Sequence, residues 1–434
     1  MNLVRVPNIL LPNKNIDYSK WSCIACDQFS SEPMYWAELA EKVGDSPSAL
    51  NLILPEVYLD KNTDDAIKKI NQNMLNYLNS DMFYELNSII LVERTLNNGK
   101  VRLGLMVEID LEQYEYTDKN NSYIKATEKT VTSRLPARIE IRKHAELEMP
   151  HIMMLIDDKK GDIIEKLYAD KQDMQVVYDF DLNMNGGHIR GFKVANSNDI
   201  VRKLNSLADS SVIKQKYNND GNIAFIVGDG NHSLATAKEC WNLIKQNLSE
   251  KEKLNHKARY SLVEIVNIYD QSLEFEPIHR LLVGASFDFV DSFCKAMKGE
   301  SKIKVIFDGK TYFASVPENP SDAIKNIQDF IDDYKQNHKE IVEDYIHGDN
   351  SLTQLAKKHN AVGIFMPTIS KDGLFDYCFR RGALPRKSFS MGNAEDKRYY
   401  LESKKIKWLN KNTCIFLTTF HLIVKIIFIN SIIL

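Results

Sequence analysis

A strand, a glycine-containing loop and a helix follow one another without a break in the middle of this chain. Four apolar residues, 224–227, predict a buried strand, and the next six, Gly-Asp-Gly-Asn-His-Ser at 228–233, predict a tight loop. Apolar side chains then recur at helical spacing from Leu234 to Ile244, so we expect a helix that begins at about Ser233. This unit commits the centre of the chain to a fold with both strands and helices.

The loop has the chemistry of an anion site. Its two glycines allow positive φ angles and a close approach of the backbone to a ligand. The start of a helix offers free N–H groups and the positive end of a dipole, and both suit a phosphate group. Asp229 and His232 add an acid–base pair, or ligands for a metal ion or a phosphate. The alternative is an ordinary strand–turn–helix in which Asn231 or Ser233 only caps the helix, because short glycine motifs do not separate the two interpretations.

Length, charge and cysteine content narrow the class of protein. A chain of 434 residues can bury a large core, in two or three domains or in one large domain. A net charge of −3 predicts no attraction to nucleic acid or to an anionic membrane. Six cysteines and no apolar signal segment at the N-terminus predict a cytoplasmic protein. Cys23 and Cys26 have the spacing of half a zinc site, but no second such pair completes it, so we expect two ordinary thiols.

Strands and helices are predicted along the whole chain, without repeats. Residues 88–94 and 100–109 predict a hairpin, for which Asn98-Gly99 supplies a type I′ turn. Further strands are expected at 151–156, 175–180, 188–194, 261–268 and 362–366. Helices are expected at 31–43, 64–79, 198–208, 234–246, 321–337 and 351–358. We therefore expect an α+β (mixed α/β) fold of strands, hairpins and flanking helices, without the regular alternation of a Rossmann domain or barrel.

The last residues of the chain differ in composition from the rest. Residues 414–434 are almost wholly apolar and long enough to cross a bilayer as a helix. His421, Lys425 and Asn430 interrupt this stretch, and a lysine near the middle of a bilayer is costly. We expect residues 408–434 to be an apolar extension outside the fold, with a genuine membrane anchor as the alternative.

Several charged side chains are candidate partners of the loop. Arg138 and Arg142 would share one face of a helix and could grip a phosphate, although Pro136 argues against a continuous helix there. The basic segments 386–388 and 397–398 lack the interleaved aromatic residues of a nucleic-acid surface. Four side chains able to bind metals stand at spacings that match no metal-binding template: His144, Glu146, Glu148 and His151.

Six segments resemble, in the same order, those of a bacterial and archaeal family, domain of unknown function 1015 (DUF1015), whose name assigns no activity. They are Trp21–Gln28, Arg138–Asp158, Gly187–Gly191, Gly228–Ala237, Pro277–Leu281 and Leu384–Gly392. The resemblance implies a globular region over residues 1–407, either undivided or split into sub-domains at 1–200 and 201–407. It stops where the apolar tail begins.

The loop also resembles that of the ParB/sulfiredoxin superfamily, which includes free-serine kinases and binds nucleotide phosphates there. Many DUF1015 members carry Asp-Gly-His-His-Arg where this chain has Asp-Gly-Asn-His-Ser at 229–233. The resemblance implies a ParB/sulfiredoxin-like core, with Asp229 and His232 against the transferred phosphoryl group or its metal. It implies phosphate contacts from Gly228, Gly230, Asn231 and Ser233. Because Ser233 replaces the arginine that would neutralise phosphate charge, another cation must do so: Arg138, Arg142 or Arg280.

The function that we expect is that of a small-molecule phosphotransferase, acting on a hydroxyl amino acid such as serine. The donor would be a nucleotide or pyrophosphate, with Mg²⁺ held in part by Asp229, and Asp27 or Glu32 would be the base. A phosphate-ester hydrolase and a non-catalytic nucleotide-binding or ParB-like regulatory module are the alternatives. We expect a small-molecule substrate as the partner, no nucleic acid, and no membrane unless the tail is genuine.

Overall fold

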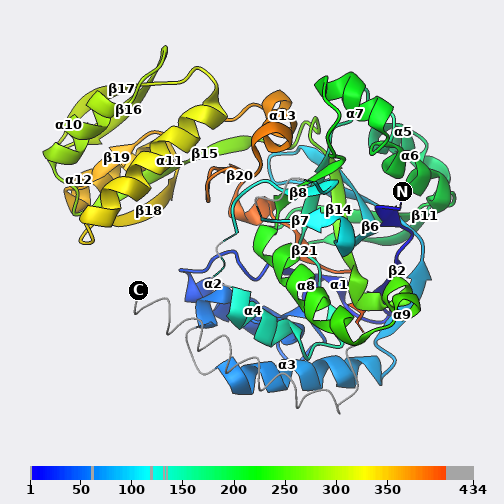
Figure 1. Cartoon of the computed structure of the whole chain (residues 1–434). Helices are drawn as coiled ribbons and strands as arrows, with labels where there is room; N and C mark the ends of the chain where they lie inside the picture. Colours follow the sequence, from blue (N-terminus) through cyan, green and yellow to red (C-terminus); the bar gives the residue numbers. More distant parts are fainter. Residues whose placement is uncertain (1, 60–62, 118–120, 131, 133–134, 407–434) are drawn as a thin grey trace.

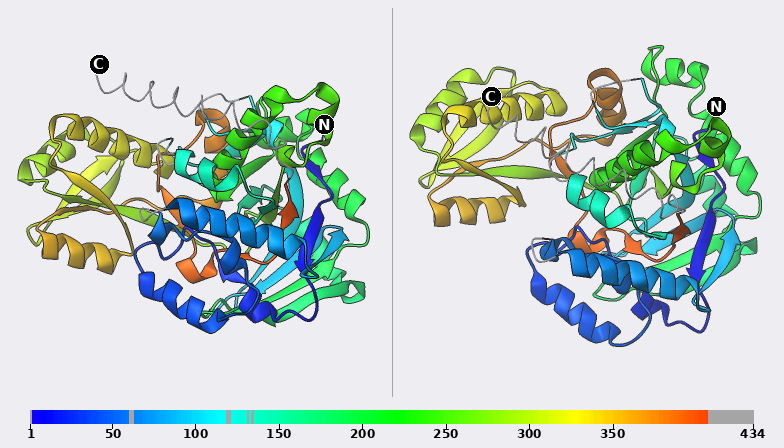
Figure 2. Two further views of the ribbon diagram at one scale, coloured as in Figure 1. Left: turned by 90° about the horizontal axis from the view of Figure 1, so that it is seen from below. Right: turned by 60° about the horizontal axis from the view of Figure 1, so that its bottom comes forward.

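The computed structural model describes residues 2–59, 63–117, 121–130, 132 and 135–406. The apolar tail at 408–434 lies outside the described residues. The described chain forms a larger sheet and a smaller one, each covered by helices, with the smaller unit set to one side (Figures 1 and 2). Among the described residues, no helix combines the length and the apolar character that a membrane crossing needs. The predicted mixed α/β fold is confirmed.

The larger sheet has ten strands and mixes parallel with antiparallel pairs. Nine strands form a continuous order: β11 (Gln175–Asp181), β12 (His188–Lys193), β5 (Ile90–Thr95), β6 (Val101–Asp110), β14 (Tyr260–Asn267), β10 (Met153–Ile156), β13 (Phe225–Asp229), β8 (Ile124–Ala126) and β7 (Tyr114–Glu115). The tenth, β1 (Val4–Arg5), pairs with β6. The pairs β10–β14, β13–β8 and β7–β8 are parallel, and the other pairs are antiparallel.

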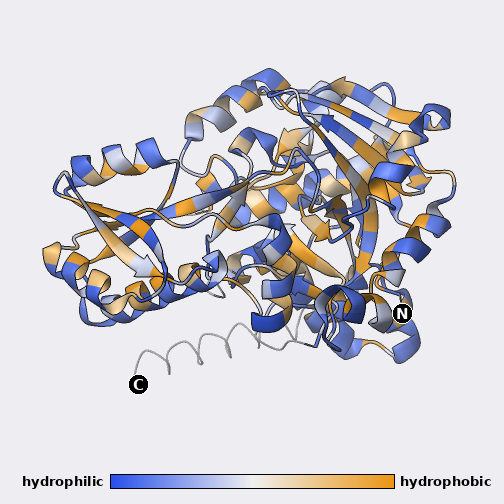
Figure 3. Cartoon of the chain, turned by 90° about the horizontal axis from the view of Figure 1, so that it is seen from above, coloured by the Kyte–Doolittle hydropathy of each residue, from blue (hydrophilic) through white to orange (hydrophobic). Residues whose placement is uncertain are grey.

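Alternation along the strands places a separate apolar core on each face of this sheet. In β6, Leu105 and Val107 join the core that contains side chains of α6 and α8, whereas Met106 joins the core under α1, α2 and α3. Figure 3 shows apolar residues along the strands and along parts of the helices that cover them. The helices of this part are α1 (Tyr18–Trp21), α2 (Pro33–Val43), α3 (Thr63–Leu78), α4 (Leu135–Arg142), α5 (Ile164–Ala169), α6 (Ser197–Ser206), α7 (Ser210–Tyr217), α8 (Asn231–Ile244) and α9 (Glu250–Asn255).

The smaller sheet has six strands and is also covered on both faces. Its strands are β17 (Lys310–Val316), β16 (Ser301–Phe307), β19 (Val362–Ile364), β15 (Phe275–Val283), β18 (Val342–His347) and, paired with the start of β15, β20 (Phe389–Met391). Leu282 faces the core formed with α10 (Phe287–Ala296) and α11 (Pro320–Asn337), and its neighbour Leu281 faces α12 (Asp349–His359). A further helix, α13 (Lys371–Arg381), packs on the same core as α10 and α11.

The chain then returns from the smaller sheet and threads through the larger unit. Residues 397–404 are all buried. Three short ribbons lie here: β21 (Tyr399–Tyr400) pairs with β3 (Cys23–Ile24), β22 (Lys404–Lys405) with β9 (Leu147–Glu148), and β2 (Asn8–Pro12) with β4 (Phe83–Asn87). Residues 397–406, which we call the C-terminal segment, therefore pair with strands from the first 150 residues of the chain.

Two local predictions were wrong, each for an identifiable reason. The hairpin β5–β6 forms, but a type I′ turn needs positive φ at both central residues, and of Asn98 and Gly99 only Gly99 has one, at 79°. The helix α4 forms in spite of Pro136, because this residue stands in the first turn, where its missing N–H is not needed. Strands from both sides of residue 200 share the larger sheet, and how far any part folds independently stays a prediction.

Candidate functional site

The predicted strand–loop–helix unit is β13, Gly230 and α8. The strand ends at Asp229, the helix begins at Asn231, and Gly230 between them has a left-handed backbone with φ 81°. The helix thus begins two residues earlier than predicted. Asp229 Oδ1 accepts the N–H of Gly230 at 2.9 Å, and no side chain caps α8. The amides of its first turn are therefore not taken up by a side-chain cap.

A side chain at either glycine of the loop would crowd a neighbouring residue, more severely at Gly230, where the neighbour is backbone. A Cβ on Gly230 would lie 3.1 Å from Ile152 Cα, and the φ of this residue favours glycine in any case. A Cβ on Gly228 would lie 2.8 Å from Met391 Cε. The backbone of the loop therefore passes close to Ile152, just before β10, and to the side chain of Met391 in β20.

A lysine from the C-terminal segment reaches the start of α8. Lys397 Nζ lies 3.3 Å from Asp229 Oδ2, and it donates to Ser390 Oγ at 3.3 Å. The side chain of Lys397 is 10% exposed and that of Asp229 is 23% exposed. Lys397 was considered in the sequence only as part of a basic segment, and nothing local in the sequence indicates that it pairs with Asp229.

A chain of polar contacts runs beside the first turn of α8. Ser233 Oγ lies 2.9 Å from His151 Nε2, and Tyr400 Oη lies 2.8 Å from His151 Nδ1. Asp27 Oδ2 is 3.8 Å from His151 Nε2. His151 is 6% exposed, so that this imidazole is held in place by its neighbours. The sequence had grouped His151 with metal-binding side chains; in the described residues no three or more His, Cys, Asp or Glu gather as a metal site.

Electrostatics keep Asp27 ionised and its neighbouring thiol neutral. Burial alone would raise the pKa of Asp27, but His151, a hydrogen bond from Gln28, and the lysines 387 and 397 together hold it below its usual value. Burial raises the pKa of the Cys26 thiol to about 12. Cys23 and Cys26 are both free thiols.

A cavity of about 140 Å³ adjoins this cluster. It is lined by side chains from several elements: Cys26, Leu52, Ile53, Leu54, Glu56, Met74, Arg138, Ile141, Arg142, Ala145, Leu147, Glu148, Met149, Pro150, His151, Ile152, Ser233, Thr236 and Tyr400. Both predicted arginines of α4 line it, and each has a carboxylate partner. Arg138 pairs with Glu56, and Arg142 NH2 lies 3.2 Å from Glu148 Oε2.

The other predicted residues lie at varying distances from this cluster. Asn231 Nδ2 donates to Thr127 Oγ1 at 3.3 Å, and His232 is half-buried in the first turn of α8. Glu32 is exposed at the start of α2 and does not line the cavity. Arg280 is fully buried in the smaller unit, where it donates to Gln328 and to backbone carbonyls, and it does not line the cavity either.

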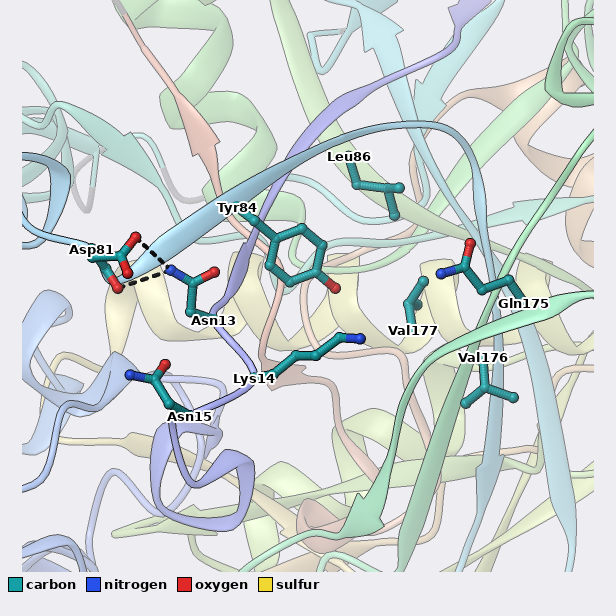
Figure 4. Close-up of a pocket in the computed structure, with 9 residues that line it drawn as sticks. All are labelled: Asn13, Lys14, Asn15, Asp81, Tyr84, Leu86, Gln175, Val176 and Val177. Atoms are coloured by element: carbon teal, nitrogen blue, oxygen red, sulfur yellow. Dashed lines mark hydrogen bonds between the residues drawn. The ribbon is translucent and has the colours of Figure 1, made fainter.

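A second hollow, of about 420 Å³, lies elsewhere, between the β2–β4 ribbon and the edge strand β11. Figure 4 shows its lining, with Lys14, Tyr84 and Gln175 around the open space and Asn13 hydrogen-bonded to Asp81. No residue of the predicted site lines it. Of these two cavities, only the one beside Ser233 is lined by residues of the predicted site.

Comparison with known proteins places the chain in a family. The sequence model of a family described as "Protein of unknown function (DUF1015)" matches residues 10–412. This match includes all six segments that carry the resemblance found in the sequence. No curated protein matches the chain.

Several solved structures show distant similarity. A conserved hypothetical protein from Pyrococcus furiosus is 12% identical, with 70% of this chain and 95% of that chain covered and a TM-score of 0.36. A free serine kinase in complex with AMP is 14% identical, with coverages of 70% and 91% and a TM-score of 0.36. SbnI from Staphylococcus aureus is 8% identical, with coverages of 66% and 82% and a TM-score of 0.36. At such TM-scores the likeness says nothing about the activity of this chain.

Proposed function

This chain belongs to the DUF1015 family, as its motifs predicted, and we propose that it is a small-molecule phosphotransferase that holds phosphate at the start of α8. The ammonium group of Lys397, 3.3 Å from Asp229 Oδ2, is the observation that carries the proposal. It supplies a cation at the start of a helix that no side chain caps, where the helix dipole favours an anion.

Lys397 supports the proposal because it supplies a positive charge that this loop lacks in comparison with many of its relatives. Ser233 stands where many relatives have an arginine, and phosphoryl transfer requires positive charge near the transferred group. Arg280 cannot take that role, since its donors are used within the smaller unit. Arg138 and Arg142 pair with carboxylates on the cavity wall, whereas Lys397 pairs with Asp229 of the loop itself and so stands at the start of α8.

The cavity beside Ser233 suits an acceptor that carries a hydroxyl group. A hydroxyl placed there would meet His151 Nε2, and Asp27 Oδ2 lies 3.8 Å from the same nitrogen, so these two groups would accept and stabilise the proton. Asp27 is favoured over Glu32 as the acidic partner, because Glu32 is exposed away from the cavity. The resemblance of the loop to that of free-serine kinases makes serine and related hydroxyl amino acids the first acceptors to test.

The donor in this proposal is a nucleotide or pyrophosphate, with Mg²⁺ as its companion. Mg²⁺ is commonly held by one or two carboxylates together with the phosphates of the substrate, and Asp229 fits that role. When bound, the ion neutralises charge on the phosphates. Asp229, through the ion, and Lys397 would then orient the donor at the start of α8, while the amides of α8 contact its phosphate oxygens.

Thermal unfolding in the presence of ligands tests the proposal. ATP, ADP, pyrophosphate or phosphoserine should raise the melting temperature of the wild type, since a ligand that binds only the folded state stabilises it. Lys397→Met should lose most of this shift. Lys405→Met is the matched control, because Lys405 pairs with Glu85 at the surface. Equal shifts in both variants, or no shift with any of the four ligands, would contradict the proposal.

One observation favours the phosphate-ester hydrolase as the second candidate. The 2.9 Å contact between Ser233 Oγ and His151 Nε2 is of the kind that activates a hydroxyl for attack on an ester. Release of inorganic phosphate from phosphoserine without any acceptor would support this candidate over the phosphotransferase. A ligand-induced shift without turnover of any kind would instead support a nucleotide-binding module.

A further inference from the structure

We infer that Ser233 is a covalent carrier of the phosphoryl group and that His151 is its base. The inference rests on the proposed function and adds a step to it. Ser233 lines the cavity, stands in the first turn of α8, and places its Oγ 2.9 Å from His151 Nε2. A serine hydroxyl is a weak nucleophile until a neighbouring base takes its proton, and a contact of this length lets that transfer occur.

The neighbours of His151 support the tautomer that the step requires. Tyr400 Oη accepts the N–H of Cys26 at 3.2 Å and lies 2.8 Å from His151 Nδ1. Burial, together with the nearby Cys26 and Asp27, raises the pKa of Tyr400, so the phenol keeps its proton and can donate it to the Cys26 sulfur. His151 Nδ1–H then donates to Tyr400 Oη, and Nε2 is left to accept the Ser233 proton.

Asp27 supplies the charge that this proton transfer needs. Its carboxylate oxygen is 3.8 Å from His151 Nε2, and its pKa is held below the usual value in spite of its burial, so that a negative charge stands beside the imidazole. When His151 takes the Ser233 proton it becomes a cation, and a carboxylate at this distance stabilises it. Tyr400 is a positioning residue in this arrangement, whereas Ser233 and His151 contact the reacting atoms.

The reaction balances with a phosphoanhydride donor such as a nucleoside polyphosphate or pyrophosphate. Ser233 Oγ attacks the terminal phosphorus, the bond from that phosphorus to the bridging oxygen breaks, and the shortened phosphate leaves with the bond's electron pair. The Ser233 proton moves to His151 Nε2. His151 then gives this proton to the departing phosphate and is neutral again. An acceptor hydroxyl in the cavity attacks the phosphoserine, its proton moves to His151 Nε2, and His151 passes a proton to Ser233 Oγ as the bond from phosphorus to Oγ breaks. Water in place of the acceptor would complete a hydrolysis.

The carrier can be tested without knowing the natural donor. A fluorophosphonate reacts with a serine that a base has activated: the Ser233 oxygen bonds to phosphorus, fluoride leaves, and His151 takes the proton. Peptide mapping of the labelled full-length wild type should place the label on Ser233. Ser233→Ala should remove that label, and His151→Gln should slow labelling on the order of a hundredfold or more. Ser206→Ala, on the exposed side of α6, is the control that should label like the wild type.

The outcomes separate this inference from the function on which it rests. A wild type that gains no label at Ser233 overturns the inference, and this measurement requires no variant to fold. Labelling that proceeds equally fast in a folded His151→Gln also overturns it. Phosphate-induced stabilisation without a label would leave the proposed function standing and remove the carrier. If Ser233 is labelled but no phosphate ligand binds, the activation of Ser233 by His151 is supported and the proposed phosphotransferase function is contradicted. With ATP or pyrophosphate, mass spectrometry should find a phosphoryl group on Ser233.

Discussion

Lys397 and Asp229 are far apart in the sequence and meet at the start of α8, where Nζ of one lies 3.3 Å from Oδ2 of the other. The lysine arrives on the buried C-terminal segment, and the aspartate ends the strand β13. Together they form a pair of opposite charges at the start of a helix that no side chain caps. The pair explains how a carboxylate can stand in a loop that we propose as a phosphate site, since the ammonium group offsets its repulsion.

Asp229→Asn should change phosphate binding in opposite directions with and without Mg²⁺. Without the ion, loss of a negative charge beside the phosphate should tighten pyrophosphate binding by roughly threefold to tenfold. With the ion, loss of the carboxylate that holds it should weaken binding. The Asn side chain can still accept the Gly230 N–H, so the loop should keep its conformation. Calorimetric titration of pyrophosphate into wild type and variant measures both effects, and a change of the same sign in both buffers would contradict the assignment.

Gly230→Ala should destabilise the protein more than Gly99→Ala. Both residues have a left-handed φ, 81° and 79°, and an alanine in that region costs about 1–2 kcal/mol. Only at Gly230 does the new Cβ also press on Ile152, at 3.1 Å from its Cα, whereas nothing lies within 4 Å at Gly99. Urea denaturation of the two variants compares their free energies of unfolding. Equal losses would mean that the contact with Ile152 carries no cost.

The strand–loop–helix unit could be predicted from the sequence because its signals are local. The apolar run before Asp229, the glycines and the helical spacing after Ser233 all lie within one short stretch, and β13 and α8 form there. The pairing of Lys397 with Asp229 has no such signal, since it depends on how the chain returns from the smaller sheet. His151 could be noticed as a reactive side chain, but its partner Ser233 becomes its neighbour only when β10 pairs with β13.

Arg280 shows that a residue type alone does not predict where its side chain lies. Its residue type suggested a role in neutralising phosphate, but the side chain of a strand residue can equally turn inward. Arg280 on β15 is fully buried and satisfies its donors with Gln328 and with backbone carbonyls. Residue type and position in a motif predicted the chemistry of this side chain, whereas the direction in which it points depends on the register of the smaller sheet.

The C-terminal segment should be essential for folding, whereas the apolar tail should not. A chain that ends at Ile406 keeps the whole C-terminal segment, residues 397–406, and should unfold cooperatively. A chain that ends at Asp396 loses Tyr399, Tyr400 and Leu401, which are 0–2% exposed. Their burial contributes roughly 5–9 kcal/mol, which is comparable to the whole stability of a typical domain. Circular dichroism during heating distinguishes the two chains. Aggregation of the chain that ends at Ile406 would show that the apolar tail takes part in the fold.

His188 should contribute to stability at low pH and lose that contribution as the pH rises. Hydrogen bonds to Asp181 and Asp179, each 2.7 Å, raise its pKa above the usual 6.5. The folded state therefore holds the proton more tightly, so the contribution is complete below about pH 6.5 and disappears as the pH passes the raised value. The difference in unfolding free energy between wild type and His188→Gln, measured in urea, should be larger at about pH 5.5 than at about pH 8.5. A difference in unfolding free energy that grows as the pH rises would contradict the raised pKa of His188.

Phosphorus NMR of the full chain tests phosphoryl transfer at the α8 loop most directly. Serine and related hydroxyl compounds are incubated with ATP, ADP or pyrophosphate, with and without Mg²⁺, and the spectra are followed for a new phosphate monoester. The account predicts that the wild type forms such an ester, and that Asp229→Asn and His232→Ala, both confirmed as folded, do not. An ester that forms in both variants as fast as in the wild type, or no ester with any donor and acceptor, would contradict it.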